Sequence, residues 1–450
     1  MFEIIRNLGA FIVALGILVA VHEWGHFIVA RKCGVKVLRF SIGFGKPLYK
    51  RITSTGMEFV IAAVPLGGYV RMLDGRVDMV APEDEAASFD QKPVWQRFAI
   101  VAAGPGINFL FAIFISMAVF MIGQNTAKPY IGAIISDSYI ALTGAEVGDK
   151  IVKVGSNQTE SWKAVNIELI SYIGADKIPL TVEKPNGREV TYTMNMPNWQ
   201  FDPEIDNIFD SIGFDIFRTK PKKIIAVVAV GGPSALAGLQ EKDEIVKLNG
   251  TFMTEWGQIV DYIEPRANET VEVEVLRDGE SRLFSVTLGE TQTPNGSKGL
   301  LGIYNEYEAY PEAYYFNNQS GPFEALVKGT QETWRLMTFT VEMLGKFITG
   351  DVSVKNLSGP ISIAQGAGIH ASYGIIAFLG FLALISVNLG IINLLPLPML
   401  DGGHLMYFTA EWITGKPVPD AVQEIGFKIG GVLLFMLMAT AIFNDILRIT

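Results

Sequence analysis

Apolar residues gather in four long segments of the chain, and polar residues fill the intervals between them. A helix that crosses a membrane needs about 20 mainly apolar residues. Four windows have roughly this length, at residues 8–30, 98–122, 375–395 and 426–443. We therefore expect an α-helical integral membrane core of four transmembrane helices. A cleaved signal sequence is the alternative for the first window, but the apolar run is long for a signal and no small-residue cleavage site follows it.

The charge of the intervals predicts the orientation of the spans, because cytoplasmic loops are enriched in Lys and Arg. Residues 31–97 hold 11 Lys and Arg against 7 Asp and Glu, whereas residues 123–374 hold 21 against 32. We expect the first interval in the cytoplasm and the second on the outer side, which is the periplasm in a Gram-negative bacterium. If the cell is a Gram-negative bacterium, the expected location is its inner membrane. A second cytoplasmic loop is expected at 405–425, before a last span that ends at 444.

The outer interval contains an internal repeat. The stretch ALTGAEVGDKIVKVGSNQTESW (141–162) aligns with ALAGLQEKDEIVKLNGTFMTEW (235–256), 94 residues further on. The repeated pattern resembles the core of PDZ domains, so we expect two mainly β PDZ domains at 127–217 and 222–308. PDZ domains bind peptides by adding a strand to a sheet edge. A role as a spacer or steric plug is the alternative for these two domains.

Residues 320–350 have a different pattern. Apolar side chains recur there at helical spacing, but charged residues such as Glu332 and Arg335 interrupt them, so the segment is too polar to span. We expect an amphipathic helix that lies in the membrane interface or packs on the outer domains. Ordinary core packing is the alternative.

Composition adds two limits. The single cysteine, Cys33, excludes an intramolecular disulfide, so the outer domains must be held by their cores alone. The net charge of −10 argues against a nucleic-acid partner. Membrane lipid is the expected surrounding of the helical core.

The candidate chemistry lies inside the first apolar window, in the sequence HEWGH (22–26). His22 and His26 are four residues apart, so on a helix their imidazoles lie on one face and can reach the same metal ion. Glu23 lies beside them, able to take a proton from water, and His-Glu-x-x-His is the arrangement of zinc hydrolases. A charged group at the centre of a span costs about 2.5–3.5 kcal/mol, which favours a functional site over packing. A buried polar cluster or a proton relay is the alternative.

The depth of this motif can be estimated from the helix rise. His22 lies 14 residues beyond Leu8, which places it about 21 Å into a hydrocarbon core of about 30 Å. The motif is therefore expected near the cytoplasmic side of the membrane.

A catalytic zinc site usually has three protein ligands, so two imidazoles are not sufficient. The third window reaches the same depth at its inner end and continues to 404 in the sequence NLLPLPMLDGGH (393–404). Its two prolines must end the helix. Asp401 follows and is our preferred third ligand, with His404 as the competitor, and the glycines at 402 and 403 are expected to allow tight turning.

These motifs together resemble the site-2 protease family of intramembrane zinc metalloproteases. The resemblance covers nearly the whole chain, and no ligand position departs from the family's pattern. It rests on HEWGH, on GPGINF (104–109) in the second span, on NLLPLPMLDGG (393–403), on LSGPISIA (357–364) and on tandem PDZ domains between the second and third spans.

The resemblance implies a zinc metalloendopeptidase that hydrolyses peptide bonds within transmembrane segments. It implies that His22, His26 and Asp401 bind Zn²⁺, that Glu23 is the general base, and that Asn393 helps to hold the substrate backbone. The implied substrates are single-span membrane proteins, notably an anti-sigma factor in envelope-stress signalling, and remnant signal peptides. The PDZ pair is expected to act as a size filter that admits only substrates whose outer domain has been removed.

Residues 31–97 contain two Gly-rich, β-prone stretches, SIGFGKPLYKR (41–51) and MEFVIAAVPLGGYVRML (57–73). We expect a membrane-associated β-hairpin insertion beside the metal, a feature that the family resemblance also implies. Its exposed edge, with Gly67 and Gly68, is expected to pair with an unwound substrate. An ordinary cytoplasmic β-subdomain is the alternative.

Two other classes of protein remain alternatives. A non-catalytic membrane scaffold would use the PDZ domains to bind exported C-termini. A metal or proton transporter would use the same ligands, but the four spans contain no internal repeat, which disfavours it.

Overall fold

The computed structural model describes residues 2–197, 199, 207–229, 231–293, 296–309 and 311–449. Its helices are α1 (Phe2–Lys32), α2 (Val94–Ile122), α3 (Trp162–Ser171), α4 (Ile208–Ile212), α5 (Pro233–Ala237), α6 (Trp256–Ile263), α7 (Pro322–Thr349), α8 (Pro360–Ser372), α9 (Ile375–Leu394), α10 (Asp401–Thr414) and α11 (Asp420–Ile449). Within the described residues, α1, α2, α9 and α11 are the four helices long and apolar enough to cross a membrane.

The strands form a hairpin near the start of the chain and, further on, two larger sheets and three two-stranded sheets. They are β1 (Val37–Ile52), β2 (Glu58–Met72), β3 (Asn125–Ala127), β4 (Ile131–Ile134), β5 (Lys150–Val154), β6 (Asn157–Gln158), β7 (Lys177–Glu183), β8 (Glu189–Asn195), β9 (Phe214–Ile216), β10 (Pro221–Val228), β11 (Glu244–Leu248), β12 (Thr251–Phe252), β13 (Thr270–Arg277), β14 (Glu280–Thr287), β15 (Gly289–Thr293), β16 (Gly296–Leu300), β17 (Ile303–Tyr307) and β18 (Tyr315–Asn317).

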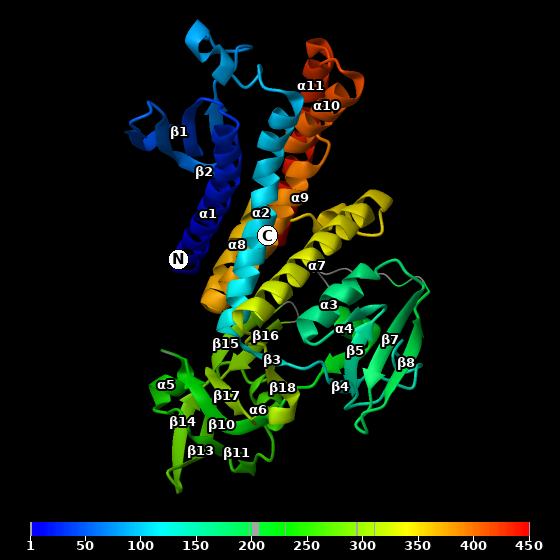
Figure 1. Ribbon diagram of the computed structural model, residues 1–450. Coiled ribbons are helices and arrows are strands. Elements are labelled where there is room, and N and C mark those ends of the chain that lie inside the picture. The colour runs from blue at the N-terminus through cyan, green and yellow to red at the C-terminus, as the bar shows by residue number, and fades with distance from the viewer. Residues whose placement is uncertain are drawn as a thin grey trace.

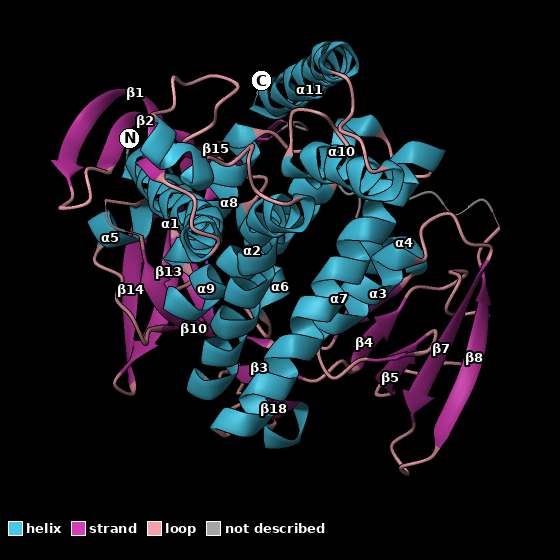
Figure 2. Ribbon diagram, turned by 45° about the horizontal axis from the view of Figure 1, so that its top comes forward, coloured by secondary structure: helices cyan, strands magenta, loops and turns pink. Residues whose placement is uncertain are grey.

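Helix α2 runs through the middle of the helical body (Figure 1). It packs against α1 on one side and against α7, α9 and α10 on the other. The β1–β2 hairpin lies beside α1, and the two outer β-domains lie at the end of the body where α2 ends (Figures 1 and 2). Since the strongly apolar α2 touches α1 as well as α7, α9 and α10, it joins the first and last parts of the chain.

The β1–β2 hairpin is one bent unit rather than two separate hairpins. Both strands bend, so that four segments lie in the order 47–52, 58–62, 39–42 and 68–72. The two outer pairs are antiparallel, whereas the inner segments 58–62 and 39–42 run in the same direction. Gly43 and Gly45 have φ values of +91° and +86° at the bend of β1, a conformation that residues with a side chain rarely adopt. The segment 68–72 is left as an edge, because no described strand pairs with its outer side.

The sequence repeat reappears as two β-domains with the same succession of elements. In the first domain (residues 129–217) the sheet order is β6-β5-β7-β8, and in the second (residues 220–309) the equivalent strands give β12 and β13 on either side of β11, with β14 next to β13. The repeated Asp149 and Asp243 are fully buried and pair with Lys184 at 2.9 Å and Arg277 at 2.6 Å. Each domain therefore has its own apolar core and its own buried ion pair.

Strands β3 and β18 join the two ends of the outer region. Residues 125–127 pair antiparallel with residues 315–317, so the chain leaves α2 and returns toward α7 at one place. The two β-domains together are thus an insertion with adjacent ends.

The structure differs from the sequence-based expectation in two segments, and in a third it forms the expected helix. Residues 405–414 belong to helix α10 rather than to a loop, and α9 ends at Leu394 with a separate helix beginning at Asp401. Helix α8 was not predicted, because it is short and rich in Gly and Ala. The amphipathic segment forms α7, which packs on α2 and α9 as well as on α3 of the first β-domain.

The LSGP sequence before α8 is held by the last helix. Asp445 of α11 is fully buried and accepts hydrogen bonds from the backbone N–H groups of Gly359, Ile361 and Ser362 at 2.9, 2.8 and 3.1 Å. A carboxylate at this place satisfies the free N–H groups of the first turn of α8 and interacts favourably with the helix dipole. Asp445 therefore anchors α11, which is otherwise largely exposed, to α8.

Candidate metal centre

Helices α1 and α2 approach closely at the level of HEWGH because both lack a side chain there. A Cβ atom on Gly25 would lie 2.4 Å from the carbonyl oxygen of Ala103, and one on Gly104 would lie 2.2 Å from His26 Nε2 and 2.9 Å from His22 Cε1. These distances are well inside van der Waals contact. The two glycines therefore allow the imidazoles of α1 to lie directly against the backbone of α2.

Three side chains that were predicted as ligands converge on one point. The Nε2 atoms of His22 and His26 lie 3.2 Å apart, and Asp401 Oδ2 lies 3.2 Å from the first and 3.5 Å from the second. Among the described residues, His22, His26 and Asp401 are the group of three potential ligands that could hold one metal ion. His404 is not a member of this group.

The geometry of these atoms fits a zinc ion. Tetrahedral zinc with bonds of about 2.0–2.1 Å has ligand atoms about 3.3 Å apart, close to the three separations in the structure. Asp401 Oδ2 is also buried without an aligned hydrogen-bond donor, although both imidazoles are near it. A buried carboxylate oxygen without such a donor is costly, and a metal ion bound between the three side chains would remove that cost.

The end of α9 and the start of α10 position Asp401. Pro396 and Pro398 lie in the short connection, and Asp401 occupies the first turn of α10. A Cβ atom on Gly402 would lie 2.2 Å from the carbonyl oxygen of Leu395, and one on Gly403 would lie 2.5 Å from that of Leu397. These glycines were expected to allow a turn, but they are helical, and what they provide is close packing of α10 on the connection.

The second ring nitrogens of the two histidines are held by α2. His26 Nδ1 lies 2.9 Å from the carbonyl oxygen of Ile100, and His22 Nδ1 lies 3.1 Å from the side-chain amide of Asn108. A hydrogen bond at Nδ1 fixes the tautomer and ring orientation of a metal-binding imidazole that uses Nε2. Both rings therefore direct Nε2 toward Asp401.

Glu23 lies between the metal ligands and the hairpin. Its side chain is only 8% exposed, and it accepts a backbone hydrogen bond from Val70 of β2. A Cβ atom on Gly68 would lie 2.9 Å from Glu23 Cγ. The edge segment 68–72 thus touches the predicted general base. The sequence predicted a hairpin near the metal, but not this contact.

The other residues predicted for the site are not among the three that converge as potential metal ligands. Gly67 has a φ of +147° and lies against the ring of Phe44, so it shapes the hairpin itself. Asn393 is half-buried in the last turn of α9. His404 packs between the rings of Phe408 and Phe427, at centroid distances of 6.5 and 5.6 Å, and this apolar setting favours a structural role.

Asn108 is a residue of this site that was not among those predicted from the sequence. It belongs to the GPGINF sequence, and a fully buried Asn within an apolar span is itself a signal, since polar side chains at membrane depth are usually functional. No local spacing connects it to His22.

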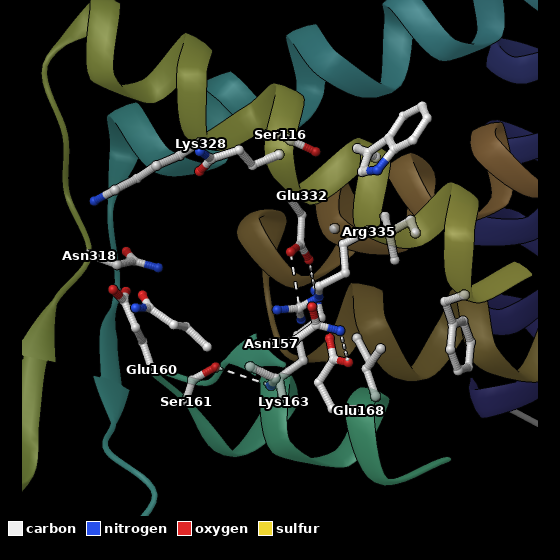
Figure 3. A pocket seen from close by; sticks show the side chains of 18 of the residues that line it. Ser116, Asn157, Glu160, Ser161, Lys163, Glu168, Asn318, Lys328, Glu332 and Arg335 are labelled. Carbon is white, nitrogen blue, oxygen red and sulfur yellow. Dashed lines mark hydrogen bonds and ion pairs between the residues drawn. The ribbon is translucent and has the colours of Figure 1, made fainter. Parts of the chain in front are cut away.

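A separate cavity of about 850 Å³ lies away from the metal ligands, between α3 of the first β-domain and helices α2, α7 and α9 (Figure 3). Lys163 of α3 donates to Glu332 of α7 at 2.8 Å across it. Although burial raises the pKa of Glu332, the cations Lys163 and Arg335 lower it below the usual value. This ion pair links the first β-domain to the helical core.

Comparison with known protein families shows which class of protein has this arrangement. The model of Peptidase family M50 matches residues 10–437, which is almost the whole chain, and the chain therefore belongs to this family. It is an enzyme, a zinc metalloendopeptidase of the site-2 protease type, and its four apolar helices make it an integral membrane protein.

Individual relatives agree with this class over their full length. The chain is 45% identical over 452 residues to the regulator of sigma-E protease of Salmonella typhimurium and 44% identical over 452 residues to that of Escherichia coli, with 100% of each chain covered. It is 47% identical over 453 residues, again with full coverage of both chains, to a Vibrio cholerae protein whose name assigns it as a candidate zinc metalloprotease.

The contact between Gly104 and the imidazoles gives a testable prediction. Gly104→Ala is expected to displace His26 and lower zinc affinity and cleavage at least about tenfold, because its Cβ atom would lie 2.2 Å from His26 Nε2. Gly106→Ala is the matched control, since nothing lies within 4 Å of its Cβ position two residues further along α2. Zinc content and cleavage of a single-span test substrate are the measurements, and equal behaviour of the two variants would contradict the packing argument.

Proposed function

We propose that this protein cleaves peptide bonds within the transmembrane segments of single-span membrane proteins. His22, His26 and Asp401 would hold Zn²⁺, and Glu23 would be the general base. The observation that carries this proposal is the convergence of the three ligand atoms within 3.5 Å of one another, with the buried Glu23 beside them.

The chemistry divides between the metal and the side chains of this chain. A zinc ion at this place would polarise a peptide carbonyl and make water acidic enough to ionise near neutral pH. Glu23 takes the proton of the attacking water and passes it to the leaving amine, so the C–N bond breaks as the new C–O bond is completed. The Val70 N–H donates to the Glu23 carboxylate and thereby orients it for this transfer.

The substrate must be unwound before it can react, because a transmembrane helix hides its carbonyl groups in internal hydrogen bonds. The edge segment 68–72 is a suitable partner for the unwound stretch, since it is unpaired on its outer side and touches Glu23 through Gly68. Gly67 would shape this edge by its positive φ. Asn393, in the last turn of α9, would also hold the substrate backbone.

The proposed location is the bacterial inner membrane, with the two β-domains in the periplasm and the active site near the cytoplasmic side. The excess of Lys and Arg in residues 31–97 supports this orientation. Both termini are then periplasmic, and membrane lipid surrounds the four spans. The hairpin would lie at the inner leaflet, because its edge is at the level of Glu23.

The proposed substrates are an anti-sigma factor in envelope-stress signalling and remnant signal peptides. The names of the Salmonella and Escherichia relatives connect those proteins to the regulation of sigma-E. Both substrates consist of a short apolar span with little structure outside the membrane after a first cut. Such a span fits a site that needs an unwound chain.

The two β-domains are proposed to be PDZ domains that act as a size filter. Their shared order of strands and helices follows the sequence repeat. The first domain is tied to α7 by Lys163 and Glu332, and α7 packs on α2, so this domain lies beside the core that holds the ligands. A substrate with a large outer domain would meet this obstacle, whereas a trimmed one would pass it.

Chelator-sensitive cleavage tests the proposed function. The full-length protein in detergent is expected to cut a single-span test substrate within its span, to lose this activity after metal removal, and to regain it with Zn²⁺. Mass spectrometry of the products gives the position of the cut. A protein that binds exported C-termini but never cuts the substrate would instead be the scaffold alternative.

The adjacent ends of the outer region allow a clean test of the size filter. Lys128 N donates to Tyr314 O at 2.9 Å, so residues 129–313 can be replaced by a short Gly-Ser linker without moving β3 or β18. We expect this variant to cleave a substrate whose outer domain is intact, which the full chain refuses. The same deletion with Glu23→Gln is the control for cleavage by another protease. Continued refusal of the untrimmed substrate would count against the filter.

A further inference from the structure

Asn108 is a buried polar residue that the mechanism above leaves without a role. It lies one helical turn after Gly104 on α2, on the face that packs against α1, and its side chain is fully buried in an otherwise apolar helix. Its amide group meets only one of the site residues, His22, with Nδ2 placed 3.1 Å from His22 Nδ1. The other amide atom, Oδ1, is buried without a hydrogen-bond partner.

The orientation of this amide can be argued from its partner. The oxygen and nitrogen of an Asn side chain have nearly the same shape, so their assignment follows from the hydrogen bonds around them. A neutral imidazole carries its proton on one nitrogen and a lone pair on the other. His22 Nε2 points at Asp401 and His26, and it needs its lone pair there to bind a metal ion, so the proton belongs on Nδ1. That N–H requires an acceptor, and turning the amide by about 180° presents Oδ1 to it.

His26 is held in the equivalent way. Its Nδ1 lies 2.9 Å from the backbone carbonyl oxygen of Ile100, which can only accept a hydrogen bond. Helix α2 therefore supplies one acceptor to each imidazole, from the main chain for His26 and from a side chain for His22. Because a backbone carbonyl cannot be removed by substitution, Asn108 is the contact of this kind that mutation can test.

The backbone at Asn108 is fixed independently of its side chain. Ser386 of α9 is fully buried, and its hydroxyl donates to the carbonyl oxygen of Asn108 at 2.8 Å. This bond ties α2 to α9, the helix that leads to Asp401. The side chain of Asn108 is thus presented from a rigid place, and a change of the side chain can be separated from a change in helix packing.

From these contacts we propose that Asn108 is a positioning residue for His22. Its side-chain carbonyl accepts the Nδ1–H of His22, selects the tautomer with a free Nε2 and holds that nitrogen in line with His26 and Asp401. The inference rests on the proposed metal site and assigns the residue that prepares one of its ligands.

The test uses three full-length variants in detergent and measures their affinity for Zn²⁺ in competition with a chelator. Asn108→Leu keeps the branching at Cγ but is larger and has no acceptor, and we expect zinc affinity to fall about 10–100-fold, the usual loss when such a supporting contact is removed. Asn108→Asp has only acceptor oxygens, and we expect it to stay within a few-fold of the wild type. Ser386→Ala removes the bond between α2 and α9 but leaves the acceptor, and its affinity should also stay near the wild type.

Each result has a definite meaning. Wild-type affinity in Asn108→Leu would overturn the inference, and so would an Asn108→Asp variant as weak as Asn108→Leu, because the carbonyl would then not be the group that matters. An equal loss in Ser386→Ala would reduce Asn108 to a packing role and overturn it as well. A wild-type protein that binds no zinc would overturn the proposed metal site itself, which is a distinct outcome. If Asn108→Leu fails to fold, the zinc affinities of Asn108→Asp and Ser386→Ala are compared. Loss of affinity in Asn108→Asp alone would overturn the acceptor role. Retention of affinity in Asn108→Asp supports that role.

Discussion

Glu23→Gln is expected to abolish cleavage of a single-span substrate while the protein still binds zinc. The amide has the size of the carboxylate but cannot take a proton from water, and loss of a general base costs about 10²–10⁴-fold in rate. Glu23 is not one of the three converging ligands, so metal content should stay near that of the wild type. The two measurements are the rate of substrate cleavage and the zinc content of the same purified sample.

Glu3→Gln is the matched control for this substitution. It makes the same chemical change on the same helix, at an exposed position near the start of α1. We expect it to cleave at the wild-type rate. Full activity in Glu23→Gln would show that another group moves the proton, and loss of zinc in that variant would show that Glu23 helps to hold the metal.

Asp401→Asn is expected to lower the affinity for zinc at least about 100-fold, with cleavage falling in parallel. Removing a contact that only supports a ligand already costs 10–100-fold, and this change replaces an anionic ligand by a neutral one. The shape of the side chain is kept, so the start of α10 should be undisturbed. Metal content after dialysis and cleavage at saturating zinc separate weak binding from a defect in the reaction.

His404→Gln is the control for the third ligand. His404 lies three residues further along α10, between two phenylalanine rings, and it should be replaceable with little loss of zinc. Normal zinc content in Asp401→Asn together with loss in His404→Gln would make His404 the third ligand. It would also contradict the short distances from Asp401 to both imidazoles.

The parts of this fold that the sequence predicted best are those with a regular pattern. The four apolar windows coincide with helices that are long enough to span, and the 94-residue repeat reappears as two similar β-domains. The juxtaposition of His22 and His26 followed from helical spacing alone. Asp401 required a further step, because its approach to the two histidines depends on how α9 ends and not on any local spacing.

The parts that the sequence did not predict depend on contacts between distant segments. Helix α10 has two glycines in its first turn, which ordinarily indicate a turn, but here they let the helix lie against the preceding connection. Helix α8 is short and weakly patterned, and its first turn depends on Asp445 from the far end of the chain. The role of Asn108 was hidden for the same reason, since its partner is 86 residues away.

The proposed zinc ligands lie far apart in the sequence, so they are synthesised at different times. His22 and His26 are made at the start of synthesis, whereas Asp401 follows 375 residues after His26 (401 − 26). At about 5–20 residues per second, that interval lasts roughly 20–75 s. During this time the nascent chain carries two of the three proposed ligands, and both β-domains, which form the proposed filter, are synthesised before Asp401. The proposed active site is therefore complete only after the proposed size filter has been synthesised.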